Sequence, residues 1–97
     1  MSMDLETQYQ LAILADLYGP SERVQRLAGV TNEEIADRFD ALEPDEGIAE
    51  RLRPAHRRAR ALLQLVAERQ MPADERLAEA VEAVRRSLRE IEAWSGR

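Results

Sequence analysis

The chain has 97 residues, and all 14 of its Lys or Arg residues are arginine; cysteine is absent. Disulfides, thiolate catalysis, cysteine-bound metals, a Schiff-base lysine and a P-loop lysine are therefore excluded. Apolar residues make up 44% and charged residues 34%, which is typical of one globular domain, and no apolar run is long enough to cross a membrane.

The predicted fold class is all-α, a small bundle of four to five helices that ends in an antiparallel hairpin of the two C-terminal helices. Helical spacing of apolar residues predicts helices over about 4–18, 20–28, 32–43, 46–70 and 73–94. Gly19-Pro20 is expected to separate the first two, and Pro54 either to kink the fourth helix or to begin a new one. Thr31 and Glu34 match a capping box at the start of the third helix.

A heptad pattern marks the last helix, with apolar residues at Leu77, Val81, Val84, Leu88 and Ile91. This pattern predicts a packed seam inside the C-terminal hairpin. Trp94 lies beyond it and is expected either to cap the bundle core or to anchor an interface, since tryptophan is enriched at interfaces. A leftover apolar edge with Trp94 predicts a possible homodimer through the C-terminal helices.

Charge is distributed unevenly: residues 1–50 carry a net charge of −9 and residues 51–97 a net charge of +4. Glu33, Asp37 and Asp40 share one face of the third predicted helix, and Glu43 follows. Such a face is either merely solvated or binds a partner, in the manner of small acidic inhibitors from phages and other mobile elements that imitate a phosphate backbone. The sequence therefore favours a cytoplasmic, bacterial or phage protein that acts non-catalytically, as a regulator, adaptor or inhibitor, through contacts with another protein.

Five arginines fall between Arg51 and Arg60, and Arg53, Arg57, Arg58 and Arg60 are the candidate basic cluster. Guanidinium groups suit phosphate or carboxylate, so the cluster binds either nucleic acid or the acidic half of this chain or of a partner. The negative net charge favours carboxylate, so nucleic acid is the alternative partner. Residues 30–39 resemble the first helix of a helix-turn-helix motif, which makes a nucleic-acid-binding regulator using segment 31–60 the alternative function.

No catalytic residue, cofactor or metal is predicted. Glu33-Glu34-x-x-Asp37 resembles the first carboxylate motif of all-α nucleotide pyrophosphohydrolases, and this resemblance implies magnesium held between helices. Those enzymes need a second carboxylate pair on the next helix, where residues 48–70 offer only Glu50 and Glu68. A magnesium-dependent nucleotide pyrophosphohydrolase is therefore the least unlikely enzyme, but the chain is not predicted to be an enzyme.

The single histidine, His56, follows Ala55 on the basic helix. The Ala-His pair resembles the phospho-acceptor site of histidine phosphotransfer domains. Ala59 and Arg60 stand where that motif has lysine and glycine, and the glycine is what lets a response regulator approach. We therefore expect His56 to be an inert surface residue.

Overall fold

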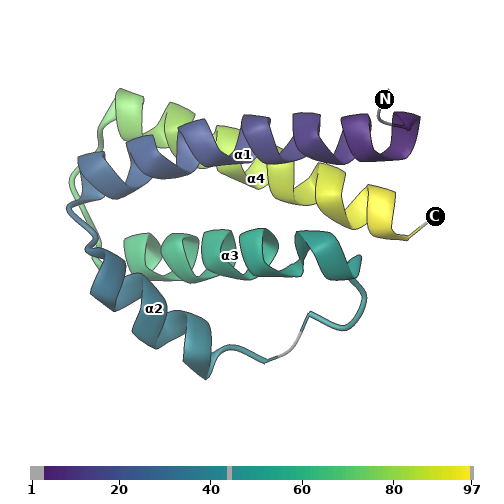
Figure 1. Cartoon of the computed structure of the whole chain (residues 1–97). Helices are drawn as coiled ribbons and strands as arrows, with labels where there is room; N and C mark the ends of the chain where they lie inside the picture. The colour runs from purple at the N-terminus through teal and green to yellow at the C-terminus, as the bar shows by residue number, and fades with distance from the viewer. Residues whose placement is uncertain (1–3, 44, 97) are drawn as a thin grey trace.

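Four α-helices and one short 3₁₀ helix form a computed structural model that describes residues 4–43 and 45–96 (Figure 1). In chain order they are α1 (Leu5–Ala28), α2 (Asn32–Ala41), η1 (Glu50–Leu52), α3 (Arg53–Glu68) and α4 (Glu75–Ser95). The described residues contain no strand, so the all-α fold class is confirmed. Among these residues, no helix combines the length and apolar character that crossing a bilayer requires.

The predicted break at Gly19-Pro20 is wrong, because α1 continues through both residues. Proline has no backbone N–H, so the Asp16 carbonyl, four residues earlier, loses its intrahelical donor. The Ser87 hydroxyl of α4 lies 3.3 Å from this carbonyl and 3.1 Å from the Ala83 carbonyl of its own helix, so its one proton is shared between the two acceptors. A side chain from the neighbouring helix thus compensates in part for the hydrogen bond that the proline cannot donate, and the two predicted helices form one helix of 24 residues.

Two sets of hydrogen bonds satisfy the carbonyl groups at the C-terminal end of α1. Gly29 adopts the left-handed conformation with φ 66°, and the N–H of Val30 then reaches the Gln25 carbonyl at 3.0 Å. The Arg69 guanidinium, at the far end of α3, donates to the Ala28 and Gly29 carbonyls at 3.1 and 3.0 Å. These contacts join the end of α1 to the end of α3.

The other helix ends agree in part with the sequence patterns. Thr31 caps α2 by accepting a bond from the Glu34 N–H at 3.1 Å, while the Glu34 carboxylate accepts from the Thr31 hydroxyl and not from its backbone. Of the two expectations for Pro54, a new helix is correct, since α3 begins at Arg53 with proline in its first turn. Asp74 caps α4 by accepting from two backbone N–H groups.

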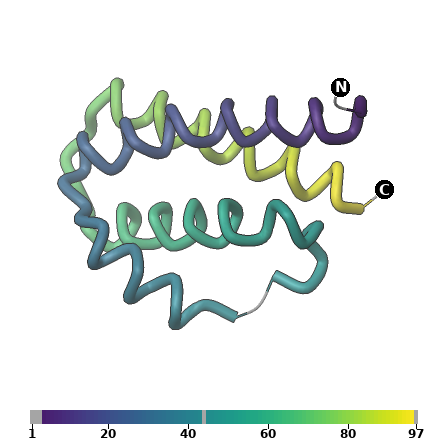
Figure 2. The backbone as a smooth tube through the Cα atoms, viewed as in Figure 1, coloured from purple at the N-terminus to yellow at the C-terminus, as the bar shows by residue number. Residues whose placement is uncertain are grey.

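The most extensive helix packing in the bundle is between α1 and α4, which lie side by side and antiparallel (Figures 1 and 2). Helix α4 also runs antiparallel to α3, but it packs more extensively on α1, because the continuous α1 is long enough to match it. Helix α2 packs against α3 on the opposite side. All four helices contribute residues to the hydrophobic core. Its buried members include Ile13, Leu17, Ile35, Ala59, Leu62, Val84 and Ile91.

Candidate functional site

The predicted basic cluster holds the segment that connects α2 to α3. Arg53 Nε donates to the Ile48 carbonyl at 2.7 Å. Arg57 Nε donates to the Phe39 carbonyl at 2.8 Å, and its guanidinium lies 4.8 Å from the centre of the Phe39 ring, within cation–π range. A second Arg57 nitrogen donates to the Leu42 carbonyl. Both arginines therefore satisfy main-chain carbonyl groups of their own chain.

His56 lies at the centre of a charged network, and the expectation that it is a surface residue is wrong. The residue is 3% exposed because α3 turns it toward α4 and the α2–α3 connection. Its Nδ1 lies 3.0 Å from Asp45 Oδ2, and its Nε2 lies 3.0 Å from Glu92 Oε1. Arg60 bonds the other Asp45 oxygen, and the Asp45 side chain is 3% exposed.

This network leaves His56 without a free ring nitrogen. A phosphoryl acceptor needs an accessible nitrogen lone pair, and here Asp45 and Glu92 cover both nitrogens. The arrangement therefore suits a structural link between α3, α4 and the α2–α3 connection, and it does not match the exposed histidine of a phosphotransfer domain.

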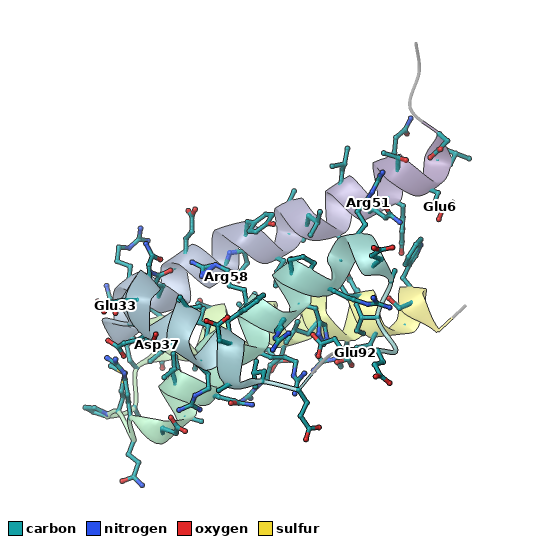
Figure 3. All side chains as sticks on the ribbon, turned by 60° about the horizontal axis from the view of Figure 1, so that its bottom comes forward. Glu6, Glu33, Asp37, Arg51, Arg58 and Glu92 are labelled. Carbon is teal, nitrogen blue, oxygen red and sulfur yellow. The ribbon has the colours of Figure 1, made fainter. Side chains whose placement is uncertain are left out.

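Arg58 is the member of the basic cluster that turns toward α1 (Figure 3). Its guanidinium lies 3.2 Å from Asn32 Oδ1 and 3.4 Å from Gln25 Oε1, and these two amides bond each other at 2.8 Å. Arg58 and Tyr18 also line a cleft of about 250 Å³ between α1 and α3. The cleft is smaller than the roughly 300–1,000 Å³ usual for small-molecule sites.

Two ion pairs attach the inner side of α2 to the end of α3. Arg38 binds both carboxylate oxygens of Glu68 at 2.8 Å, and Arg69 binds Glu34. The hydrogen bond from Arg38 lowers the pKa of the Glu68 carboxyl, and the hydrogen bond from Arg69 lowers the pKa of the Glu34 carboxyl. Each of the two carboxylates therefore faces a guanidinium where the pyrophosphohydrolase resemblance implies a metal. Among the described residues, no cluster of histidine and carboxylate groups is arranged to hold a metal ion.

The outer side of α2 carries the predicted acidic face, and Figure 3 shows Glu33 and Asp37 projecting from it. Glu33, Asp37, Asp40 and Glu43 are all exposed. No ion pair found within the described part of the chain involves any of the four. The structure thus separates the carboxylates of α2 into an inner set bound to arginine and an outer set that faces solvent.

The structure also tests the roles predicted for Trp94 and for the segment that resembles a helix-turn-helix. Trp94 is partly buried and packs against the hydrophobic core, which is the first of the two roles expected for it. Residues 42–52 separate α2 from α3, whereas a helix-turn-helix joins its helices by a turn of about three or four residues. The segment 31–60 therefore lacks the tight turn of that motif.

Sequence reasoning missed Asp45 and Glu92 as the partners of His56. A signal for its burial was present, because His56 lies four residues after Leu52 and three before Ala59, both of which are buried. No spacing rule could select Asp45, since it lies in an irregular connection that contains several acids.

No protein family model, no curated protein and no solved structure matches this chain.

Proposed function

We propose that this chain is a non-catalytic protein–protein interaction protein, a small regulator, adaptor or inhibitor, whose partner-binding surface is the outer acidic face of α2. The observation that carries the proposal is that the basic cluster is bound within the chain, whereas the acidic face of α2 is exposed to solvent. The arginines of α3 bind carbonyl and side-chain groups of their own chain, whereas Glu33, Asp37, Asp40 and Glu43 remain exposed and outside the described ion pairs.

An acidic face of this kind suits a partner with a basic groove. Three of its carboxylates lie one turn apart along α2, and such a row presents regularly spaced negative charge to a cationic surface. Association through exposed charge is strongest at low ionic strength, so binding to the partner should weaken as salt is added. The inner ion pairs Arg38–Glu68 and Glu34–Arg69 fix α2 on α3 and so orient the outer row.

Affinity capture from the native host, followed by identification of the retained proteins, tests the proposal. The test variant combines Glu33→Gln, Asp37→Asn and Asp40→Asn. The control combines Glu75→Gln, Glu79→Gln and Glu90→Gln, which removes the same charge from exposed positions on α4. A protein retained by the wild type and the control but lost from the test variant would support the proposal. Capture that is unaffected by the α2 substitutions would contradict it.

The alternative function is a nucleic-acid-binding regulator that uses Arg51–Arg60. It has less support, because Arg53, Arg57 and Arg60 would have to leave partners in their own chain to reach phosphate. Nucleic acid in the captured material that disappears with Arg57→Gln and Arg60→Gln, and survives neutralisation of the α2 face, would favour this alternative.

A further inference from the structure

The cleft between α1 and α3 has an apolar inner wall and a charged mouth. The apolar side chains that line it are Leu17, Ala55, Ala59 and Leu62. A second hollow adjoins the cleft at the end of α1 and shares its polar residues Glu22, Gln25 and Arg58, but none of these four apolar residues. The polar residues therefore lie where the cleft opens toward the second hollow, and the apolar residues lie farther in.

Arg58, at the mouth of this cleft, differs from the rest of the basic cluster (Figure 3). Arg53, Arg57 and Arg60 each bond a carbonyl or carboxylate group of their own chain. Arg58 is partly buried, yet no ion pair in the described part of the chain includes it. Both of its hydrogen bonds come from Nη2 and go to amide oxygens, which leaves Nε and Nη1 without an acceptor among the described residues. Because a partly buried cation normally has an anionic partner, Arg58 offers a site for an anionic group.

Two other polar groups that line the cleft are also without partners. Glu22 takes part in no ion pair of the described residues, and in particular it does not pair with Arg58. The hydroxyl oxygen of Ser21 is buried and bonds no group of the described residues. Since a buried hydroxyl without a partner is costly, a polar group of a bound molecule would stabilise it.

The lining of the cleft indicates the chemistry of its ligand. A molecule with only a negative charge would be repelled by Glu22, and one with only a positive charge by Arg58. An α-amino acid carries both charges on one carbon atom, and the apolar inner wall suits an apolar side chain. The volume of about 250 Å³ equals that of about eight water molecules at roughly 30 Å³ each, which suits leucine or phenylalanine but not a nucleotide.

We infer that this cleft binds a free α-amino acid with an apolar side chain. The ligand's carboxylate accepts hydrogen bonds from the Arg58 guanidinium, whose fork of donors suits a carboxylate. Its ammonium group donates to Glu22, and its side chain contacts the apolar inner wall. Tyr18 also lines the cleft and is 51% exposed, so its ring is available to cover the ligand. The inference goes beyond the proposed function, because it concerns another surface and each can fail without the other.

Nitrogen-15 NMR correlation spectra of the whole chain, titrated with L-leucine or L-phenylalanine up to about 20 mM, test the inference. Saturable shifts are expected at Tyr18, Ala55 and the Arg58 side chain, with a dissociation constant of about 1 mM, as is usual for so small a ligand. Glycine, which has no side chain to bury, should bind at least about tenfold more weakly. The absence of saturable shifts with both apolar amino acids, or glycine that binds as tightly as they do, would overturn the inference.

Two analogues of leucine test the charges on the unchanged protein. N-acetyl-L-leucine lacks the ammonium group and L-leucinamide lacks the carboxylate, so each should bind at least about tenfold more weakly than L-leucine. The same analogues represent the last and the first residue of a peptide. An analogue that binds as tightly as L-leucine would overturn the inference and assign the cleft to the corresponding end of a peptide.

Substitutions at the mouth identify the protein groups involved. Arg58→Gln and Glu22→Gln should each weaken L-leucine binding about tenfold. Arg85→Gln and Glu79→Gln remove the same charges from exposed positions on α4 and should leave it unchanged. The Arg58→Gln protein should also bind L-leucinamide as tightly as L-leucine, whereas mere damage to the fold would weaken both and preserve their ratio. An unchanged ratio, or an equal loss in the α4 controls, would contradict the inference.

Discussion

Replacement of Asp45 by asparagine should destabilise the fold far more than its position in an irregular connection suggests. The Asp45 side chain is 3% exposed and binds His56 and Arg60. Asparagine has the same shape, but its amide nitrogen would face one of these two donors. Removal of one partner from a buried pair costs about 3–5 kcal/mol. Arg60 is 36% exposed and regains water, which places the expected loss near the lower limit, at about 3 kcal/mol.

Urea denaturation followed by circular dichroism measures this loss, which is a large part of the roughly 5–15 kcal/mol expected for a domain of this size. Asp40→Asn, an exposed carboxylate of α2, is the control and should change the free energy of unfolding by less than about 0.5 kcal/mol. Glu92→Gln should cost less than about 1 kcal/mol, because that side chain is 54% exposed. A loss for Asp45→Asn no greater than for Asp40→Asn would refute the role given to the network.

Three further predictions concern stability. Ser87→Ala should cost about 1–2 kcal/mol in the wild type and less than half of that in a Pro20→Ala background, because alanine restores the missing N–H; a double-mutant cycle measures the coupling. Gln10→Leu should raise the free energy of unfolding by about 1 kcal/mol in urea denaturation, because the described residues offer its buried amide oxygen no donor. The melting temperature should fall as the pH drops below 4.5, because the lowered pKa values of Glu34 and Glu68 stabilise the fold above that value, and this stabilisation is lost through the folded pKa. A Glu34→Gln, Glu68→Gln variant should show a shallower fall.

The helix pattern could be predicted from the sequence because periodicity reports which residues face a core. The all-α class and the cap at Thr31 follow from local rules, whereas those rules left two alternatives at Pro54, of which the new helix is correct. The continuity of α1 does not, because a proline ends a helix unless something replaces its hydrogen bond. Here the replacement comes from Ser87, which is 71 residues away from Asp16 in sequence. Local rules carry no information about such a distant donor.

The candidate site was predictable in its composition but not in its geometry. The sequence identifies the arginine cluster and allows it to bind the acidic half of the chain. Which groups it binds depends on how Leu42 and residues 45–49 lie over α3, and Arg53 and Arg57 bind carbonyl groups, which every residue has. The burial of α1 was harder to predict. Its apolar stripe is wide enough to suggest burial on more than one side, but Leu5, Tyr9, Leu11 and Tyr18 remain exposed.

The most direct test of the account asks whether the arginines of α3 are bound to their own chain. Hydrogen exchange at the Nε–H groups, followed by nitrogen-15 NMR, reports this bond by bond. The Arg57 Nε–H, which donates to the Phe39 carbonyl at 2.8 Å, should exchange with water at least about tenfold more slowly than the Nε–H of Arg85, which is exposed on α4. Equal exchange rates would contradict the account, because they would mean that the basic cluster is free to bind an external partner.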